Sequence, residues 1–531
     1  MREDDDGNRS GVVATLAAAT LGSGVVNLWS LAVPDAPRRI AVLRTIFPLE
    51  FLQLSRQLTF VLGIALVIAS LNVYRRKARA LHAVAALSVL SMAFHLTKGI
   101  DYESASCSLA LLALLVASRR QFQVRSGSLD WRGMAIVSVA AGVCILGYTV
   151  LRGTLGGSRD ALRLASPAQF TVAATALYGT LSAFRPAVYR LRTAPQLRAR
   201  ASRLIETHGR SNLDFFKIWP EKSIFFGPTG GAFLAYGVGL GMAVVLGDPV
   251  GREEEISSVV RAFSAECHRN DWALAFYQTL PDFVPVYRRL GFRRLKIGDE
   301  AMVDLRAFSL DGPARKSLRT GLRKVEAAGV RYEHYDPPIS PQLLDELHSV
   351  SDEWLRLPGR RERHFALGHF DRDYIRTTPV AAARAGDGRM LAFVNTLVSN
   401  RTAFVGGSLP KPSEATGDLM RRRTEAPNGV MDYLFLQTFL LYQRRGIERF
   451  SLGMAPMAGF APGENASPEE RAVHAFFQQL GFMFSFRGIK AYKAKFATSW
   501  EPRYVIFRHA LDLPRVGFAL MRLSDAPRDT A

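Results

Sequence analysis

The chain has 531 residues, more than one ordinary domain, and its 68 lysines and arginines against 47 aspartates and glutamates give a net charge of +21. A soluble nucleic-acid-binding protein explains this charge but not the 48% hydrophobic content, whereas a membrane protein with a basic cytoplasmic part explains both. The three cysteines, Cys107, Cys144 and Cys267, are scattered without CxxC spacing, so neither a disulfide framework nor a metal site is expected.

Six apolar stretches in the N-terminal third predict a bundle of transmembrane helices. Residues 1–10 carry four acids, unlike the basic start of a signal peptide, and residues 11–33 form an uncharged run long enough to cross about 30 Å of bilayer. The other predicted spans are residues 58–74, 80–96, 104–118, 133–151 and 171–184. Residues 40–54 are apolar but interrupted by charges and a proline, which favours an interfacial or re-entrant helix.

The loops predict the orientation of this bundle. Arginine-rich loops follow the second, fourth and sixth predicted spans, so both chain ends are expected in the cytoplasm. No acid or base interrupts a span, and the usual mark of an ion or substrate pathway is therefore missing. We expect residues 1–189 to serve as a membrane anchor or as a platform for lipid access.

From about residue 212 the pattern changes to alternating strands and helices. The residues predict strands at 241–246, 272–277 and 292–297, with helices at 253–269 and 283–290 between them. This order is typical of the GNAT acyltransferase fold. A similar order returns in strands 392–398, 402–407 and 450–453 and helix 468–480, which indicates two diverged copies of one α/β module, at residues 190–308 and 309–531.

GNAT acetyltransferases cradle pyrophosphate with a glycine-rich loop at a helix N-terminus. The corresponding places, residues 247–251 and 421–429, do not have the required Gln/Arg-x-x-Gly-x-Gly/Ala spacing. Acetyl-CoA is therefore disfavoured, and no cofactor is expected.

The segment from Gly417 to Phe435 concentrates the candidate chemistry. Asp418 and Arg421 lie three residues apart and would share a face if this stretch were helical. An Asn-Gly turn follows, and the apolar spacing from Met431 predicts a helix with Asp432 in its first turn, where the helix dipole favours an acid. On local sequence alone, an ordinary ion pair and an acid that complements the helix dipole are the favoured explanations of these residues.

Several phrases taken together resemble the aminoacyl-phosphatidylglycerol synthases of bacteria, the multiple peptide resistance factor family. They are residues 247–251, 277–278, 298–301, 351–355, 362–370, 418–421, 429–432, 451–456, 487–496 and 500–504. The resemblance covers the whole soluble part and extends into the predicted spans. Longer family members carry further spans that act as a lipid flippase, which this chain is too short to hold, so the resemblance implies synthesis and leaves flipping of the product open.

The resemblance implies transfer of an amino acid from aminoacyl-tRNA to phosphatidylglycerol in the bacterial cell membrane, by cytoplasmic GNAT-type modules. Lysine is the first expectation for the amino acid, with alanine or ornithine as alternatives, and the product lipid would resist cationic peptides. The donor ester already holds the energy, so no ATP motif is needed. Asp418 would take the proton of the lipid hydroxyl, and Arg421 would face the oxyanion.

Further residues are candidates for substrate binding. Glu353 and Asp432 would hold the α-ammonium of the donor, although a solvated acid and a helix cap explain them too. A strand is predicted over residues 487–496. Its basic side chains would bind phosphates of the tRNA or the lipid, or would simply be the solvated charges of an edge strand. These side chains are Arg487, Lys490, Lys493 and Lys495. Trp500 and Arg503 would stack on the terminal adenine or simply pack the last strand.

Two other functions fit the same pattern. The acceptor could be a neutral glyceride or a peptide amine, or the protein could be a lipid transporter or sensor with inactive GNAT modules. The uncharged spans argue against transport, and the Asp418 to Arg421 phrase argues against inactive modules.

Overall fold

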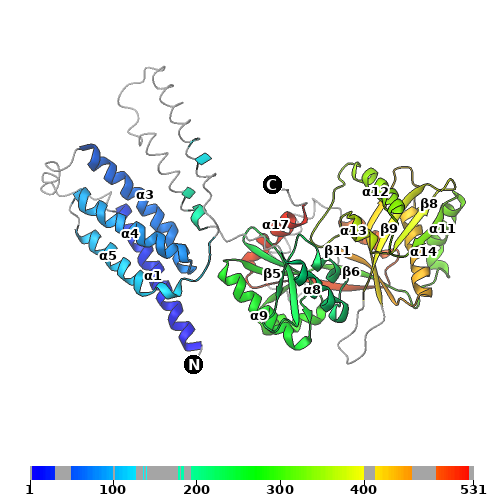
Figure 1. Ribbon diagram of the computed structural model, residues 1–531, viewed down its shortest axis with the longest axis horizontal. Coiled ribbons are helices and arrows are strands. Elements are labelled where there is room, and N and C mark those ends of the chain that lie inside the picture. The colour runs from blue at the N-terminus through cyan, green and yellow to red at the C-terminus, as the bar shows by residue number, and fades with distance from the viewer. Residues whose placement is uncertain are drawn as a thin grey trace, which may run out of the picture. The chain divides into compact units, whose positions relative to one another are not determined.

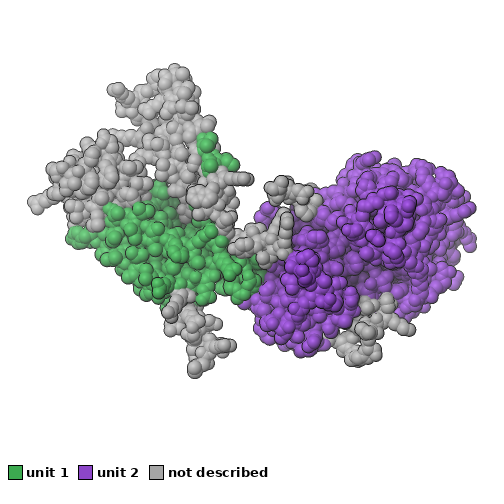
Figure 2. All heavy atoms as spheres, viewed as in Figure 1, with its two compact units in different colours: residues 1–188, 266–272 green, residues 189–265, 273–531 purple. Residues whose placement is uncertain are grey.

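The computed structural model describes residues 3–29, 49–99, 102–126, 193–399, 413–456 and 486–525, with a few short pieces between residues 135 and 184 (Figure 1). The chain forms two compact units (Figure 2). One comprises residues 1–188 with 266–272, and the other residues 189–265 with 273–531.

The first unit is helical. Its described long helices are α1 (Glu3–Trp29), α3 (Leu49–Tyr74), α4 (Ala78–Gly99) and α5 (Tyr102–Ala117). Small residues bring α1 and α3 together, because a Cβ atom on Gly24 would lie 2.9 Å from the Gly63 carbonyl oxygen. Inside this bundle Asn27 accepts a hydrogen bond from Ser91 and contacts His95, so polar side chains meet one another between the helices.

These helices coincide with the first four predicted spans, but a six-span bundle is not confirmed. Among the described residues, Gly11–Trp29 is the one stretch long and apolar enough to cross a membrane, and Thr59–Tyr74, Ala78–Ala93 and Ala105–Ala117 are shorter apolar helices. The predicted span 133–151 and most of 171–184 lie outside the described residues, as does most of the predicted interfacial segment 40–54.

The second unit is built on one 12-stranded sheet in the order β1-β2-β3-β5-β12-β6-β11-β10-β9-β8-β7, with β4 paired to β2. Its strands are β1 (Ser223–Phe226), β2 (Ala232–Gly239), β3 (Met242–Leu246), β4 (Val250–Gly251), β5 (Ala273–Thr279), β6 (Arg293–Asp304), β7 (Arg331–Tyr335), β8 (Val380–Arg384), β9 (Met390–Ser399), β10 (Glu414–Arg422), β11 (Arg449–Pro456) and β12 (Ser499–Phe507).

The same local arrangement occurs twice along this sheet. Helix α9 (Glu253–Arg269) connects the parallel strands β3 and β5, and α14 (Val430–Arg444) connects the parallel strands β10 and β11. Antiparallel strands β2 and β9 lie beside the first strand of each pair. The GNAT-like expectation is therefore confirmed for the second unit, including the predicted helix 253–269, the short helix α10 (Val284–Arg289) and the strand at 241–246.

The two modules share strands. The long strand β6 pairs with β12 through residues 293–302 and with β11 through residues 298–304. Strand β12, near the C-terminal end of the chain, lies between β5 and β6 of the first module. The expected boundary between residues 308 and 309 thus does not divide the sheet, because the last strand returns to the first module.

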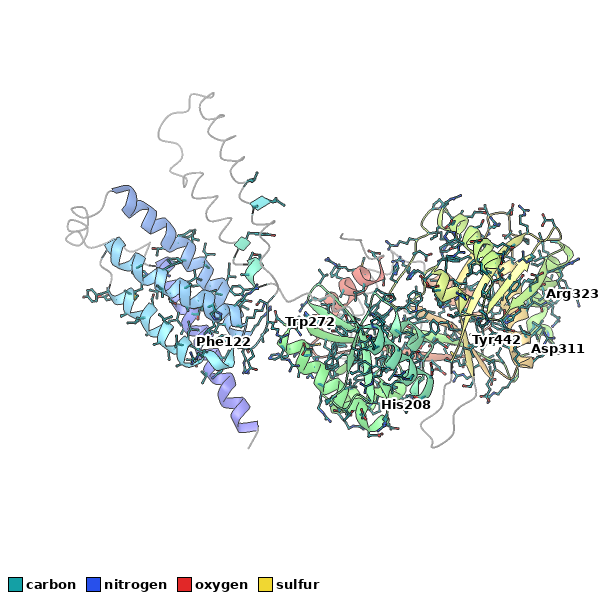
Figure 3. The ribbon with its side chains drawn as sticks, in the orientation of Figure 1. Phe122, His208, Trp272, Asp311, Arg323 and Tyr442 are labelled. Carbon is teal, nitrogen blue, oxygen red and sulfur yellow. The ribbon has the colours of Figure 1, made fainter. Side chains whose placement is uncertain are left out.

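Helices cover both faces of the sheet around β10. On one face, α12 (Pro341–Leu355), α13 (Arg372–Arg376), α17 (Leu513–Ser524) and the turn η2 (Asn212–Ile218) enclose a core that both modules share. On the other face lie α11 (Lys316–Ala327), α14 and α16 (Phe486–Ala494). Tyr442 of α14, labelled in Figure 3, is buried there and hydrogen-bonds Thr396 of β9.

The structure decides one conditional assignment and corrects one predicted element. The stretch around Asp418, for which a helix was considered, is strand β10, which pairs with β9 on both sides of a bulge and with β11 through residues 414–416. The stretch 486–494 is helix α16 and not a strand. Its helical spacing brings Tyr492 and Phe496, four residues apart, onto the core beneath α14, and the period-two placement of its lysines therefore does not hold.

Candidate active site

A β-bulge in β10 places Asp418 and Arg421 on the same face of the sheet. Gly417 pairs with Thr396 and Met420 with Val394, so three steps along β10 match two along β9. In a regular strand, residues three apart point to opposite faces, and the extra residue cancels this alternation. The side chain of the buried Asn395 accepts a hydrogen bond from the Leu419 backbone N–H at 2.8 Å, which satisfies a donor that the bulge removes from the ladder.

The Asp418 carboxylate is held by two donors from the chain between α12 and α14. The Gly368 N–H donates to Oδ1 at 3.0 Å, and the Tyr374 hydroxyl donates to Oδ2 at 2.5 Å. A Cβ atom on residue 368 would lie 1.8 Å from Asp418 Oδ2, so this close approach requires glycine. Burial raises the pKa of Asp418, while the Tyr374 and Gly368 hydrogen bonds and the Arg421 charge lower it.

Tyr374 is fixed in turn by aromatic rings from the first module. Its ring centroid lies 4.9 Å from that of Trp219 and 5.5 Å from that of Phe215, and the Trp219 ring meets His369 at 4.7 Å. Phe215 belongs to η2, and Trp219 directly follows it. The group that orients Asp418 is therefore supported across the junction of the two modules.

Arg421 is buried, with 4% of its side chain exposed, and only part of its guanidinium is satisfied. Its Nη2 donates to Glu362 Oε2 at 2.7 Å, and its Cζ lies 3.9 Å from the centroid of the Trp354 ring. Within the described part of the chain, Nε and Nη1 have no hydrogen-bond partner. A buried guanidinium with two unused donors is suited to binding an oxygen-rich group.

The predicted pairing of Asp418 with Arg421 is replaced by separate partners. Glu362, in the loop 356–371, pairs with Arg421, and its second oxygen accepts from the Phe370 N–H at 3.2 Å. The same loop supplies Gly368 to Asp418. One loop thus positions an acid and a guanidinium side by side, which is an arrangement suited to proton transfer beside a developing negative charge.

Glu353 lies next to Trp354 on α12 but already has partners. Its Oε2 accepts from Arg423 Nη1 at 2.6 Å, and its Oε1 accepts from the Thr424 N–H at 2.9 Å. These bonds lower the pKa of Glu353, with the Thr424 N–H as the largest cause. In this structure Glu353 ties α12 to the end of β10.

Asp432 and the basic side chains of α16 belong to the opposite face of the sheet, with α14. Asp432 lies in the first turn of α14, as predicted, and accepts from Lys495 Nζ at 3.1 Å. Lys493 Nζ donates to the carbonyl oxygens of Gly453 and Met454 at 3.0 and 2.9 Å, and burial lowers its pKa to about 8. Lys490 lies 5.9 Å from the centroid of the Trp500 ring.

The structure therefore does not bring all the predicted residues together. Trp500 packs at the edge of the core beneath α14, and Arg503 is buried in ion pairs with Glu300 and Glu501. Arg487 lies in the first turn of α16.

Sequence reasoning did not single out Glu362, Gly368, Tyr374, Trp354 or Asn395 as site residues. Glu362 and Gly368 lie inside a phrase that resembles the synthase family, and Trp354 follows Glu353 directly. The resemblance of that sequence segment to the synthase family was the one signal that could have identified these residues. None of them lies close enough to Asp418 in the sequence for a helix or strand repeat to link them.

Comparison with known proteins identifies relatives of the whole chain. Residues 202–507 match the family model described as phosphatidylglycerol lysyltransferase, C-terminal. A phosphatidylglycerol lysyltransferase of Bacillus subtilis is 29% identical over 525 residues, which cover 96% of this chain and 59% of the relative. One from Staphylococcus epidermidis is 29% identical over 322 residues, covering 60% of this chain and 37% of the relative. The matched part of the chain thus covers less than two thirds of the length of each of these relatives.

Two solved structures resemble the second unit. The structure of L-PGS from Bacillus licheniformis is 30% identical with a TM-score of 0.54, and the match covers 62% of this chain and 97% of that one. The C-terminal domain of a protein named as a lysylphosphatidylglycerol synthetase from Agrobacterium fabrum is 32% identical with a TM-score of 0.54, covering 63% and 99%.

Proposed function

The chain belongs to the phosphatidylglycerol lysyltransferase family, and from this premise we propose that it transfers an amino acid from aminoacyl-tRNA to the glycerol hydroxyl of phosphatidylglycerol. Lysine is the amino acid proposed first, with alanine or ornithine as alternatives. The product lipid has its negative charge neutralised or reversed, which weakens the binding of cationic peptides. We place the N-terminal helices in the bacterial cell membrane as a multi-pass anchor, with the second unit in the cytoplasm.

The observation that supports this function most directly is the pair of Asp418 and Arg421 on the bulged face of β10. Asp418 is a carboxylate whose pKa is raised by burial, as a base that works near neutral pH requires. Arg421 carries two buried donors without a partner among the described residues. An acyl transfer needs both a proton acceptor at the attacking hydroxyl and donors at the oxyanion.

The proposed reaction begins when the glycerol hydroxyl of the lipid gives its proton to Asp418 and attacks the acyl carbon of the donor ester. The carbonyl oxygen becomes an oxyanion, which accepts hydrogen bonds from Nε and Nη1 of Arg421. The tetrahedral intermediate then releases the ribose oxygen of the tRNA. That oxygen takes the proton from Asp418, so one ester bond forms, one breaks and the base is restored.

The remaining candidates have supporting roles in this proposal. Glu353 and Asp432 are the acids proposed for the α-ammonium, and an incoming ammonium would replace Arg423 or Lys495 as the partner. The basic residues Arg487, Lys490, Lys493 and Lys495 are proposed to meet substrate phosphates, with Trp500 and Arg503 near the terminal adenine. Of these, Arg503 has the least freedom to move, because Glu300 and Glu501 already pair with it.

Transfer of label from charged tRNA into lipid tests the function. Membranes that contain the full chain receive separately charged lysyl-, alanyl- and ornithyl-tRNA with a labelled amino acid, and the lipids are extracted. We expect label in a ninhydrin-positive derivative of phosphatidylglycerol from one of these donors. Label in a neutral glyceride or a peptide would assign a different acceptor, and label that stays in the aqueous phase with every donor would reject the function.

A further inference from the structure

Helix α17 has an apolar outer surface as well as an apolar inner one. On the inner side, Leu513, Val516 and Ala519 are buried, and α17 packs across β2 and β3 (red in Figure 1). On the outer side, the exposed fractions are 51% for Phe518 and 44% for Met521. Leu511, in the turn that precedes the helix, is 89% exposed.

A neighbouring turn extends this outer surface. Leu240, between β2 and β3, is 51% exposed, and its carbonyl oxygen accepts from Arg515 Nη2 at 3.3 Å. Arg515 and Phe518 lie three positions apart, which places both on one side of α17, and Leu511 lies in the turn that precedes them. We call the α17 face the surface formed by Leu240, Leu511, Arg515, Phe518, Met521 and Arg522.

The charges on the α17 face are basic. Arg515 has 46% of its side chain exposed, and its acidic contact is Asp512 at 3.6 Å. Arg522 is exposed at the far end of the same side of the helix. The α17 face combines leucine, phenylalanine and methionine with arginine, so it suits a lipid interface better than water. At such an interface apolar side chains enter the acyl-chain boundary, and guanidinium groups bind the lipid phosphates.

We propose that the α17 face docks on the surface of a bilayer that contains anionic phospholipid. Four large exposed apolar side chains on one small surface distinguish it from isolated exposed residues, which are normal. Charge complementarity selects an anionic surface, because its two arginines are attracted to negative headgroups. This docking rests on the proposed function only in that a lipid-modifying enzyme must reach its lipid.

The outer side of α11 provides the contrast within the same unit. Lys316, Arg323 and Lys324 are exposed there, and no large apolar side chain of α11 is exposed. Such a helix has charge without an inserting group and fits water or a polyanion better than a bilayer. Arg323 is therefore a matched reference position (Figure 3).

A fluorescent probe on the full chain in vesicles tests the docking. Serine first replaces the native cysteines, Cys107, Cys144 and Cys267. A single new cysteine is then introduced as Phe518→Cys or Arg323→Cys, and a polarity-sensitive fluorophore is attached to it. The vesicles contain phosphatidylglycerol and phosphatidylcholine, with spin-labelled lipids as quenchers. We expect the probe at position 518 to be quenched several-fold more than the probe at position 323. This difference should shrink in vesicles of phosphatidylcholine alone. It should also shrink when Arg515→Glu and Arg522→Glu are added.

Equal quenching at positions 518 and 323 would overturn the docking. The probe at position 518 could instead report an apolar environment only at high protein density and show no quenching by the lipids. That result would assign the α17 face to contact with a second copy of the chain and would also overturn the docking on the bilayer. The measurement is repeated with Asp418→Asn, because quenching reports position and not transfer. In the protein that keeps Asp418, activity without quenching rejects the docking alone, and quenching without activity rejects the proposed function alone.

Discussion

The hydroxyl of Tyr374 donates a hydrogen bond to Asp418 Oδ2 across 2.5 Å and joins α13 to the bulge of β10. The two groups affect each other's protonation. Burial and the Asp418 charge raise the pKa of Tyr374 well above its usual value, so the tyrosine keeps its proton and remains the donor. The same bond stabilises the Asp418 carboxylate against the burial that raises its pKa. Tyr374 is therefore a positioning residue that also keeps the proposed base charged.

Tyr374→Phe should shift the pH dependence of transfer. Without the hydroxyl, the pKa of Asp418 rises further, less carboxylate is present at a given pH, and the acidic limb of the kcat profile moves to higher pH. A hydrogen bond to a charged group is worth about 1.5–3 kcal/mol, so we expect this limb to move by about one to two pH units. The measurement is kcat against pH for the purified full chain.

Tyr332→Phe is the control for this prediction. Tyr332 also hydrogen-bonds through its hydroxyl, to Thr438 at 3.3 Å, but lies on the α14 face. Its loss should leave the shape of the pH profile unchanged. A Tyr374→Phe protein whose kcat falls equally at every pH would show that the hydroxyl acts through structure and not through the charge of Asp418.

Asp418→Asn should abolish transfer and leave the fold intact. Asparagine keeps the shape, accepts the Gly368 N–H through its single oxygen and can donate from its amide nitrogen to the Tyr374 hydroxyl oxygen, but it cannot take a proton, and loss of a positioned base costs about 100- to 10,000-fold in rate. The matched control is Asp387→Asn in the exposed turn between β8 and β9, which should keep full activity. Label transfer into phosphatidylglycerol by proteins with equal melting temperatures decides the matter, and an Asp418→Asn protein with nearly normal activity contradicts the assignment.

Helices α9 and α14 were predictable because their signals are local. Helix α9 has an amphipathic repeat over its whole length, and α14 begins at a turn with Gly429 at φ 91 and is followed by Gly446 at φ 79. Strand β10 has no such signal, since its run from Gly417 to Arg422 contains no β-branched or aromatic residue. The conformation of this run is set by pairing with β9, which local propensity does not contain.

Local sequence patterns also failed to predict the contacts of the candidate site. Asp418 and Arg421 would have shared one face if the stretch were helical, whereas in the structure they share a face through a bulge. Their partners Tyr374, Gly368 and Glu362 are separated from them by 44, 50 and 59 positions in sequence. No spacing rule covers such distances, so only the folded sheet reveals these contacts. In α16, basic residues alternate locally with apolar ones, which imitates a strand although Tyr492 and Phe496 follow helical spacing.

Arg421→Lys tests whether the geometry of the guanidinium matters beyond its charge. Lysine can keep an ion pair with Glu362, but it cannot supply the Nε and Nη1 donors or stack in the same way on Trp354. Removal of one oxyanion donor costs on the order of 3 kcal/mol, so we expect kcat to fall by about 100-fold with a small change in KM. Arg389→Lys, at an exposed ion pair with Glu425, should be neutral. A normal kcat in Arg421→Lys would remove the arginine from the oxyanion role.

Lys493 provides a test of phosphate binding that does not depend on catalysis. Its two hydrogen-bond acceptors are the carbonyls of Gly453 and Met454, and burial lowers its pKa to about 8. A base is charged below its pKa and neutral above it, so Lys493 loses its charge as the pH rises through about 8. If this charge meets a tRNA phosphate, affinity for tRNA should decrease over the same pH range.

The binding is measured with an amide-linked aminoacyl-tRNA analogue, because the natural ester hydrolyses at high pH. We expect the Kd of the unmodified chain to rise between pH 7 and 9, and Lys493→Arg to remove this pH dependence because arginine stays charged. Lys493→Met should weaken binding at pH 7 and reduce the slope of log Kd against log salt concentration by about one phosphate contact. Lys324→Met on α11 is the control for loss of an exposed charge. A pH dependence that persists unchanged in Lys493→Arg would show that another group titrates, and would remove Lys493 from the phosphate-binding residues.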